Sequence, residues 1–484
     1  MLSILVCHSY FLRLDQKQIA RAKPYPPLAT LQVVSLLRKA GHRVTFFDAM
    51  LADGIEEYER LLRNGEPQLV LFYEDNFNFL SKMCLAAMRQ AACDMIGSAR
   101  RSGARVIAAG PDVSDAPAPY LRAGADLTLV GEGLSALLEL LPRLDEQPDA
   151  SSDTLVKGLS GVASFSGGNV LNASGSKDLP LVREAGLAAW DLVDMERYRD
   201  VWMRAHGYFS LNMAASRGCP FRCNWCAKPI WGNHYLQRTP SDVAAEMGHL
   251  KRAFGPDHIW FADDIFGFRV DWVAEFAAAA KAADGQIPFS IQTRADLISE
   301  RMASALRDAG CTEAWIGAES GSQKVLDAMN KGTTVSEIQS ARARLKAVGI
   351  RVGFFIQLGY LGEQLEDILA TRDLLTALRP DEIGVSVSYP LPGTKFYELV
   401  KSQLRGKTHW QDSNDLEMLF HGAYTSDFYR AIRDLLHQQI SLQTAACGSH
   451  EPRRMANAID RRWQELLNDE RKYRSPSQRS AARA

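Results

Sequence analysis

The sequence lacks any apolar run of the length that a bilayer-spanning helix needs, about 20 consecutive residues. It also lacks an excess of charge of either sign, since 56 Lys and Arg residues face 57 Asp and Glu residues. A nearly neutral chain offers no electrostatic reason to bind nucleic acid as its main partner. We therefore expect no membrane span and no nucleic-acid partner.

The sequence also lacks the features of a secretory leader and of a disulfide framework. The segment from Met1 to Cys7 is apolar but has no basic region and no small-residue cleavage site, so it predicts a strand. The eight cysteines are scattered along 484 residues, apart from one triplet. This pattern favours a reducing compartment. We expect a cytoplasmic protein.

Predicted strands and helices alternate in the first part of the chain. The strands are expected at Ser3–Val6, Arg43–Phe47, Gln68–Tyr73, Ala104–Ala109 and Asp126–Val130. Helices are expected between them, with the clearest patterns at Leu28–Ala40 and Leu80–Arg101. Such alternation predicts an α/β fold with a doubly wound, Rossmann-like parallel sheet. Ligands of such sheets bind beyond the carboxyl ends of the strands.

A second alternating series begins near Tyr208. Its strands are expected at Tyr208–Ala215, His258–Ala262, Phe289–Thr293, Glu313–Ala318, Arg351–Leu358 and Glu382–Ser388. Six strand–helix units are too few for a closed eight-stranded barrel, so they predict a partial, TIM-like (β/α)6 barrel. The carboxyl ends of its strands form the functional face of such barrels.

The pattern of elements divides the chain into four parts. Residues 1–145 hold the first sheet, and residues 146–204 are a linker whose Gly167-Gly168-Asn169 turn predicts a small hairpin. Residues 205–400 form the partial barrel. Residues 401–484 are expected to be helical, with a disordered polar tail after Arg474.

Three cysteines with the spacing C-x-x-x-C-x-x-C follow the first strand of the second series: Cys219, Cys223 and Cys226. Three thiolates in one short loop favour a metal centre, and no fourth cysteine lies nearby in the sequence. A 4Fe-4S cluster held by three thiolates keeps one iron free to bind a small molecule. That iron is the predicted seat of the chemistry.

Two other metal centres fit the loop less well. A structural zinc site usually has four ligands, and the spacing of His234 from the cysteines matches no common zinc pattern. A closed electron-transfer cluster needs a fourth cysteine. Cys311 is distant in the sequence, and its setting favours packing at the start of a strand.

The cysteine spacing, with an aromatic residue just before Cys226, resembles the signature of the radical S-adenosylmethionine superfamily. The resemblance implies that the free iron binds S-adenosylmethionine. An electron from a donor such as flavodoxin or ferredoxin then cleaves it to methionine and a 5′-deoxyadenosyl radical. Segments at later strand ends resemble further parts of the superfamily's cofactor site. They imply that S-adenosylmethionine is bound by Trp225, Asp263, Arg294, Glu319, Ser320 and Gln357.

Three of these residues also have a plain structural interpretation. Asp263, or Asp264 beside it, could cap a helix. Arg294 could form a surface salt bridge, and Trp225 could be an ordinary buried aromatic. Gln357 would be a buried polar group that needs a partner.

The order of several weaker motifs in the first part resembles the cobalamin-binding branch of the superfamily. The loop that follows the third strand is unusually polar and aromatic, and we expect it to line the lower face of a cobalamin. Alternatively, its Asn78 or Ser81 caps the long helix. The residues expected to bind cobalamin are Pro27, Asp75, Asn76, Asn78, Gly110, Asp112, Gly131, Glu132 and Gly133. The motif Asp-x-His-x-x-Gly is absent, so the resemblance implies a cobalt without a protein nitrogen beneath it.

The resemblance implies a cobalamin-dependent radical methyltransferase that acts on an unactivated carbon or a phosphorus of a small-molecule or natural-product intermediate. A radical cyclase or rearrangement enzyme of the same branch is the first alternative, and a non-catalytic iron–sulfur or corrinoid carrier is the second. Arg217 and Arg222 are expected to steady the anionic cluster. Trp410, His421 and Tyr424 are expected to form part of the substrate pocket.

Overall fold

The computed structural model describes residues 1–78, 85–166, 169–173, 186–226, 234–404, 406–407, 409–444 and 451–475. Its chain folds into two compact units. Unit 1 consists of Met1–Cys219, Ala227–Asp264 and His409–Asp415. Unit 2 consists of Pro220–Cys226, Ile265–Thr408 and Leu416–Ala484. Both units are therefore built from stretches that are separated in the sequence.

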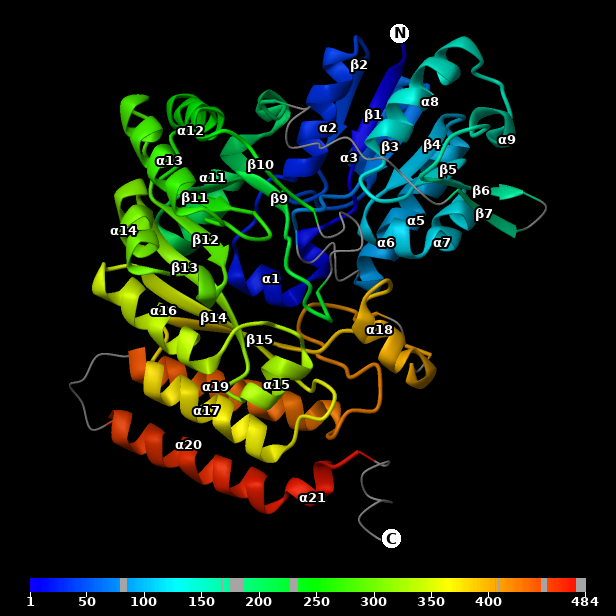
Figure 1. Cartoon of the computed structure of the whole chain (residues 1–484). Helices are drawn as coiled ribbons and strands as arrows, with labels where there is room; N and C mark the ends of the chain where they lie inside the picture. Colours follow the sequence, from blue (N-terminus) through cyan, green and yellow to red (C-terminus); the bar gives the residue numbers. More distant parts are fainter. Residues whose placement is uncertain are drawn as a thin grey trace. The chain divides into compact units, whose positions relative to one another are not determined.

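Unit 1 contains a seven-stranded sheet with the order β2-β1-β3-β4-β5-β6-β7 (Figure 1). Its strands are β1 (Ser3–Cys7), β2 (Arg43–Phe47), β3 (Leu69–Tyr73), β4 (Arg105–Ala109), β5 (Leu127–Leu129), β6 (Val162–Ser166) and β7 (Asn169–Ala173). The first five strands are parallel and lie within one residue of their predicted bounds. The predicted doubly wound sheet is confirmed.

Helices cover both faces of this sheet (Figure 1). The helices described between Met1 and His206 are α1 (Gln16–Arg21), α2 (Leu28–Lys39), α3 (Glu56–Gly65), α5 (Ala86–Arg101), α6 (Pro111–Asp115), α7 (Pro117–Ala123), α8 (Leu134–Glu146), α9 (Ser152–Leu155) and α11 (Met195–His206). One core cluster joins strand residues such as Phe72 to Tyr58 of α3 and Met95 of α5. The long helix was predicted to start at Leu80, but residues 79–84 lie outside the described part of the chain.

The predicted hairpin forms β6 and β7, which are antiparallel to each other. Its turn at residues 167–168 lies outside the described residues. β6 also pairs with β5, where Thr128 lies opposite Ala163. The hairpin therefore extends the first sheet and does not form a separate element. The four-part division of the chain stays a prediction.

The strand order places the topological switch point of the sheet beside β1. This strand pairs with β2 on one side and with β3 on the other. Open parallel sheets with the order 2-1-3-4-5 bind their ligands at this point, outside the carboxyl ends of the strands. The loop of residues 74–78, which leaves β3, therefore begins where a ligand is expected.

The second large sheet has six strands in the order β15-β14-β13-β12-β11-β8. They are β8 (Ser210–Met213), β11 (His258–Phe261), β12 (Phe289–Thr293), β13 (Cys311–Glu319), β14 (Arg351–Leu358) and β15 (Glu382–Val387). They alternate with α12 (Pro240–Phe254), α13 (Val270–Ala282), α14 (Glu300–Ala309), α15 (Gln323–Ala328), α16 (Val335–Ala347) and α17 (Leu365–Leu378). The predicted partial barrel is confirmed. A short antiparallel pair, β9 (Ser216–Gly218) and β10 (Tyr235–Gln237), stands at the start of the cysteine loop.

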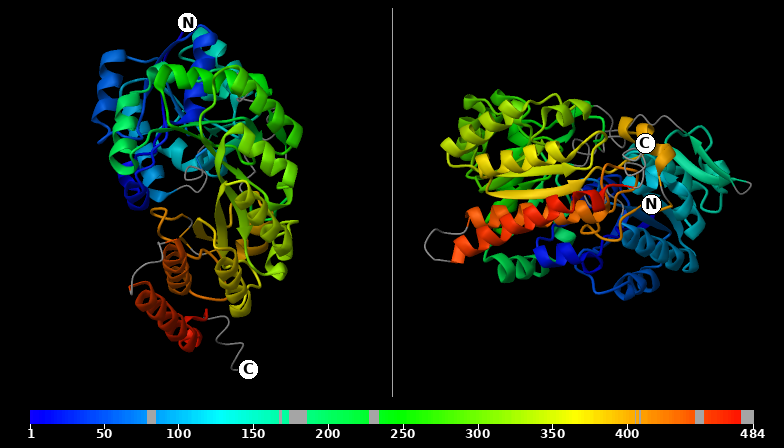
Figure 2. Two further views of the ribbon diagram at one scale, coloured as in Figure 1. Left: turned by 90° about the vertical axis from the view of Figure 1, so that its left-hand side faces the viewer. Right: turned by 90° about the horizontal axis from the view of Figure 1, so that it is seen from below.

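The C-terminal region is helical, as predicted. It contains α18 (Lys395–Val400), α19 (Ser426–Thr444), α20 (Glu451–Asn468) and α21 (Glu470–Tyr473). Helices α19 and α20 lie side by side (Figure 2). Residues 476–484, where we expect disorder, lie outside the described residues. No helix in the described part of the chain is long and apolar enough to cross a membrane.

Replacement of Gly321 by alanine should destabilise the barrel. An added Cβ would lie 2.3 Å from the carbonyl oxygen of Ala370 in α17, and backbone atoms cannot give way as a flexible side chain does. Overpacking of this kind costs about 1–3 kcal/mol. Thermal unfolding of Gly321→Ala should show a lower midpoint. Gly65→Ala is the matched control, because nothing lies within 4 Å of a Cβ at that helical position. Equal midpoints for both variants would contradict the packing described here.

Candidate active site

The three predicted cluster ligands lie in the loop that follows β9. Cys219 is buried, and Cys223 and Cys226 are half-buried. Within the described residues, no group of three or more His, Cys, Asp or Glu side chains is gathered in a way that would hold a metal ion. The assignment of the three thiols to a cluster therefore rests on their spacing and on the charges around them.

Hydrogen bonds within unit 2 fix the backbone of the cysteine loop. The Asn224 N–H donates to the Met329 carbonyl at 2.9 Å, and its side-chain amide donates to Ala328 at 3.0 Å. The Asn330 side chain donates in return to the Arg222 carbonyl at 2.8 Å. The end of α15 and the turn after it thus hold the loop at Arg222 and at Asn224.

Arg294 presents positive charge to this loop from the end of β12. Its guanidinium carbon lies 3.7 Å from the ring centroid of Phe221, and Nη1 lies 3.7 Å from the Cys223 sulfur. Asp296 and Thr333 hold the same guanidinium at 2.9 Å each. Arg294 is therefore fixed beside a predicted cluster ligand and is not a surface salt bridge.

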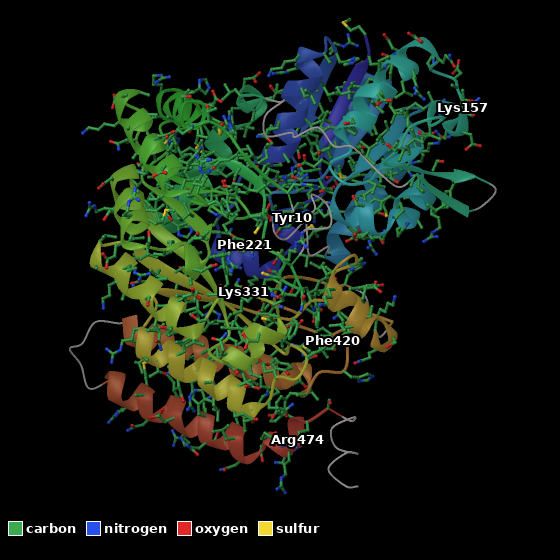
Figure 3. All side chains as sticks on the ribbon, viewed as in Figure 1. Tyr10, Lys157, Phe221, Lys331, Phe420 and Arg474 are labelled. Atoms are coloured by element: carbon green, nitrogen blue, oxygen red, sulfur yellow. The ribbon has the colours of Figure 1, made fainter. Side chains whose placement is uncertain are left out.

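A second buried cation, Lys331, lies close to the loop (Figure 3). Its Nζ lies 2.7 Å from Glu319 Oε1 and 5.9 Å from the ring centroid of Trp225. Burial lowers the pKa of Lys331, but the negative charges of Glu319 and Cys223 outweigh burial and raise it. Lys331 therefore carries a charge at neutral pH. No sequence pattern indicates this role of Lys331, because a lysine in an Asn-Lys-Gly turn is typical of an exposed loop.

Local backbone geometry makes the Lys331–Glu319 pair possible. Glu319 has a left-handed conformation (φ 59°) at a β-bulge of β13. A Cβ on Gly317 would lie 2.6 Å from both the carboxylate and the ammonium group. Glycine at this position therefore leaves room for the ion pair.

The remaining predicted S-adenosylmethionine residues of unit 2 differ in what they can still bind. Trp225 Nε1 and Gln357 Oε1 are buried and have no hydrogen-bond partner in the described part of the chain. Gln357 donates to Ser388 at 3.1 Å, and its carbonyl oxygen is left for a ligand. Ser320, in contrast, bonds with Thr371 and accepts from the Ser322 N–H. Trp225 and Gln357 can thus serve a bound cofactor, whereas Ser320 shapes its own turn.

Asp263 and Asp264 follow β11 in unit 1 and bind the strand that leads to Cys219. Asp263 is buried and accepts from the Ala215 N–H at 3.0 Å and from the Ser216 hydroxyl. Burial raises its pKa to about 7. Asp264 accepts from the Gly218 N–H at 3.1 Å. Both carboxylates therefore shape β9, and Asp263 has little capacity left for the amino group that it was predicted to bind.

The predicted cobalamin residues after β3 form a compact turn. Asp75 accepts from the N–H groups of Ala29 and Phe77, so it caps helix α2, whose first residues follow Pro27. Asn76 is buried, and its Oδ1 has no hydrogen-bond partner among the residues described. The Asn78 N–H donates to the Asp75 carbonyl at 3.2 Å. Asn76 is the side chain of this turn that is ready to bind a polar ligand.

The alternative interpretation, that Asn78 caps the long helix, stays a prediction, because residues 79–84 lie outside the described part of the chain. Helix α5 begins at Ala86, and Leu85 in its N-cap position makes no side-chain capping bond. Ser81, the other candidate cap, lies outside the described residues.

The other cobalamin candidates mostly serve the sheet itself. Asp112 pairs with Arg89 at 2.7 Å and accepts from Tyr120 at 2.6 Å. A Cβ on Gly110 would lie 2.7 Å from Glu74, and both Gly131 and Gly133 have positive φ angles. These glycines are required because the chain turns sharply and packs closely at the strand ends.

Glu132 pairs with Arg217 in the interior of unit 1. Arg217 Nε lies 2.7 Å from Glu132 Oε1, and the two side chains are 2% and 0% exposed. Burial lowers the pKa of Arg217, but the negative charges of Glu132 and Asp264 have the larger effect, so the pKa is raised overall. Arg217 was expected to steady the cluster, and the structure gives it Glu132 as its main partner.

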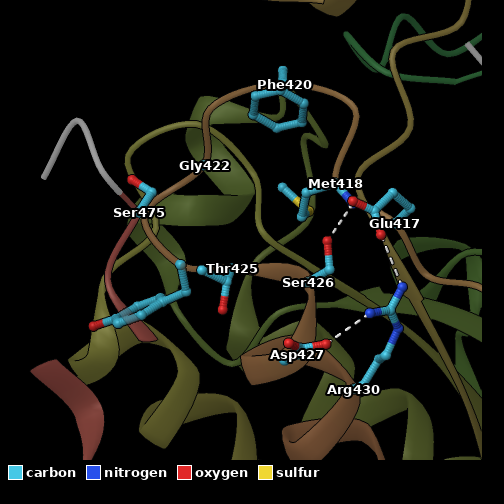
Figure 4. A pocket seen from close by; sticks show the side chains of 10 residues that line it. Glu417, Met418, Phe420, Gly422, Thr425, Ser426, Asp427, Arg430 and Ser475 are labelled. Carbon is cyan, nitrogen blue, oxygen red and sulfur yellow. Dashed lines mark hydrogen bonds and ion pairs between the residues drawn. The ribbon is translucent and has the colours of Figure 1, made fainter. Parts of the chain in front are cut away.

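A cavity of about 390 Å³ opens in the C-terminal part of unit 2 (Figure 4). Tyr424, which was expected to line a pocket, is one of its walls. The Arg430 guanidinium is held between Glu417 and Asp427 at its rim, at 2.9 Å from each. Of the other residues expected in a pocket, Trp410 is buried in unit 1 and His421 is exposed.

Residues 213–375 match the profile of the Radical SAM superfamily. This stretch is a radical S-adenosylmethionine domain. It starts at the end of β8, contains the cysteine loop and ends in α17. The superfamily predicted from the cysteine spacing is confirmed.

The relatives known from their sequences include two that each cover more than half of this chain. An uncharacterized methyltransferase of Pyrococcus horikoshii is 25% identical over 382 residues, which are 77% of this chain and 78% of that protein. The anaerobic magnesium-protoporphyrin IX monomethyl ester cyclase of Cereibacter sphaeroides is 25% identical over 285 residues, which are 58% of this chain and 45% of the cyclase. The chain thus spans less than half of the cyclase.

Two solved structures share the fold over most of this chain. The radical S-adenosylmethionine methyltransferase TsrM from Kitasatospora setae, with cobalamin and a 4Fe-4S cluster bound, has a TM-score of 0.66 and 19% identity. The similarity covers 82% of this chain and 78% of TsrM. The cobalamin-dependent radical enzyme OxsB, with aqua-cobalamin and S-adenosylmethionine bound, has a TM-score of 0.69 and 16% identity, over 96% and 72% of the two chains. The predicted fold class is confirmed.

Glu363 lies in the loop between β14 and α17 and is completely buried. Its Oε2 accepts from the Gly359 N–H, and its Oε1 has no hydrogen-bond partner in the described residues. Burial raises the pKa of Glu363 to about 8. The carboxyl group is therefore mostly protonated at neutral pH in the folded protein.

Lys331→Met should destabilise unit 2 strongly, because it leaves the Glu319 carboxylate buried without its counter-charge. Breaking a buried ion pair from one side costs about 3–5 kcal/mol. Denaturant unfolding measures the loss. The matched control is Lys401→Met, since Lys401 pairs with Glu398 at the surface and its loss should change little. A Lys331→Met protein as stable as the control would contradict the buried pair.

Glu363→Gln should stabilise the protein increasingly as the pH rises. The pKa of Glu363 is raised by folding, so its contribution to stability is complete below the unfolded value and declines up to about pH 8. Glutamine is neutral throughout and can still accept from Gly359. The difference in midpoint between Glu363→Gln and the parent protein should therefore grow between about pH 4.5 and pH 8 and then level off. A difference that is constant with pH would contradict the protonated carboxyl group.

Proposed function

We propose that this chain is a cobalamin-dependent radical S-adenosylmethionine methyltransferase that acts on an unactivated carbon or a phosphorus of a small-molecule or natural-product intermediate. One observation carries the proposal. The same chain contains a radical S-adenosylmethionine domain with a C-x-x-x-C-x-x-C loop and a parallel sheet with the strand order 2-1-3-4-5. TsrM and OxsB, which are described with cobalamin, share both parts of this fold.

The residues of the loop suit a cluster. Cys219, Cys223 and Cys226 would hold three irons, and the spacing supplies no fourth thiolate. Arg294 and Lys331 bring two buried positive charges to the loop, and these charges would balance the negative charge of thiolates and cluster sulfides.

The same surroundings suit S-adenosylmethionine. Its amino acid part carries a carboxylate, which the Arg294 and Lys331 cations would attract. Its adenine and ribose carry hydrogen-bonding groups, which the free polar atoms of Trp225 and Gln357 would satisfy. Glu319 positions Lys331, and Asp263 positions the strand before Cys219.

The switch point beside β1 suits a corrin. Asn76 offers a buried amide oxygen without a partner, which would accept a hydrogen bond from a corrin amide. Gly110, Gly131 and Gly133 let the chain turn closely at the neighbouring strand ends. Asp75 holds this turn to helix α2. Residues 1–145 would thus be the cobalamin-binding domain.

When bound, the cluster and cobalamin would supply the electron that cleaves S-adenosylmethionine and the methyl group that a substrate radical takes up. The protein residues position these groups and compensate their charges. An electron donor such as flavodoxin or ferredoxin is the expected partner. The cavity lined by Tyr424 is the candidate substrate pocket, and a cytoplasmic location stays a prediction.

A radical cyclase or rearrangement enzyme is the second candidate function. The 25% identity with the magnesium-protoporphyrin cyclase favours it. The two functions differ in how S-adenosylmethionine is consumed. Methyl transfer would use a second molecule of S-adenosylmethionine, because the methyl donor has to be regenerated.

Anaerobic reconstitution with iron, sulfide and hydroxocobalamin, followed by a count of bound cobalt and of adenosyl products, tests the proposal. A methyltransferase forms both 5′-deoxyadenosine and S-adenosylhomocysteine. Formation of 5′-deoxyadenosine alone would support the cyclase or rearrangement enzyme. A cluster whose spectrum does not change with S-adenosylmethionine would support a carrier and overturn both enzyme functions.

Cys223→Ala should lose 5′-deoxyadenosine formation and retain cobalamin, because only the cluster loses a ligand. Liquid chromatography of the products and absorbance of the corrinoid measure the two properties. Cys93→Ala is the control, since this cysteine lies in α5 outside the loop and should change neither. If Cys223→Ala kept its product yield, the cluster assignment would fail.

A further inference from the structure

We propose that Arg217 is a positioning residue that couples the turn of residues 74–78 to the cysteine loop, so that occupancy of one cofactor site tightens the other. The inference rests on the proposed function. It adds a role for a residue that lies two positions before Cys219 and contacts the predicted cobalamin turn.

Three contacts of Arg217, all within unit 1, define this role. Its Nε donates to Glu132 at 2.7 Å, and its Nη1 donates to the Asn76 carbonyl at 3.4 Å. The guanidinium carbon lies 4.5 Å from the ring centroid of Phe77. One planar group thus contacts the loops after both β3 and β5, which are the strand ends where a corrin is expected.

The strand that carries Arg217 has little freedom on its other side. The Ser216 hydroxyl and the Gly218 N–H are bound by Asp263 and Asp264. Arg217 and its two neighbours therefore make a continuous set of contacts from the turn of residues 74–78 to the residue before Cys219. A change in the order of that turn must reach the first cluster ligand through this strand.

The coupling between the two cofactor sites arises because binding at one site orders residues that the other site also uses. A ligand that fixes the turn of residues 74–78 also fixes Asn76 and Phe77 against Arg217, and hence β9. The second ligand then binds to a loop that has already lost its conformational freedom, so it binds more tightly. Reciprocity requires the same factor in both directions.

Lysine cannot take over this role. A single ammonium group can keep the charge pair with Glu132, but it lacks the planar fork that reaches Asn76 and covers Phe77 at the same time. Arg217→Lys therefore keeps the buried charges compensated and removes the connection. This makes it a test of coupling and not only of folding.

The experiment measures the dissociation constant of hydroxocobalamin for the full chain with and without a reconstituted cluster. We expect the cluster to tighten cobalamin binding at least about fivefold in the parent protein. In Arg217→Lys, the ratio of the two constants should fall to within about twofold of one. Hydrogen exchange of residues 216–219 should slow on cobalamin binding in the parent protein and not in the variant.

Arg105→Lys is the matched control. Arg105 also joins a carboxylate to backbone carbonyls, since it contacts Asp126 at 3.3 Å and the Pro148 carbonyl at 2.9 Å, but it lies at the amino end of β4. It should keep the ratio of the parent protein. Glu132→Gln weakens the same contact by changing the other partner, so it should also lower the ratio of the two dissociation constants. This variant takes the place of Arg217→Lys if Arg217→Lys does not fold.

The outcomes separate the two claims. A parent protein that binds no cobalamin overturns the proposed function and this inference with it. A parent protein that binds both cofactors with a ratio near one overturns the coupling alone. A ratio that is unchanged in Arg217→Lys and Glu132→Gln also overturns it, and an equal loss in Arg105→Lys would mean that Arg217 has no special role.

Discussion

The buried Arg217–Glu132 pair is the interaction on which the arrangement of unit 1 depends. Removing two charges from water is costly, and the attraction between them offsets that cost only when the remaining hydrogen-bonding groups find partners. Arg217 meets this condition through Asn76 and Asp264. Each partner of Arg217 follows a different strand. The ion pair therefore determines where the ends of these strands meet and also stabilises their arrangement.

Unit 2 follows the same principle with a different pair. Lys331 and Glu319 neutralise each other inside the barrel, and Arg294 is compensated by Asp296. The two cations are thereby available beside Trp225 and Cys223 without an unbalanced charge in the interior. An anion that arrives at the loop meets fixed cations, whose positions need no reorganisation when it binds.

The fold could be predicted from the sequence because its signals are local. Buried runs rich in Val, Ile and Phe, ended by Gly or polar residues, set the strands to within two residues of their observed bounds. The cysteine spacing was equally local. The ion pairs were not predictable, because Arg217 and Glu132 are 85 residues apart and Lys331 reaches Glu319 only through a bulge in β13. The hydrogen bonds of Asp263 were not predictable for a similar reason, since their donors, Ala215 and Ser216, come from another part of the chain.

The segment His409–Asp415 gives the two units an interlaced chain. It belongs to unit 1, where the Ser413 hydroxyl donates to the fully buried Asp15 at 2.8 Å and the Trp410 carbonyl accepts from Ala86. A fragment cut after the last strand of unit 1 would therefore leave a carboxylate and an indole-sized gap facing water. Neither half of this protein can be obtained intact by dividing the gene at a single codon.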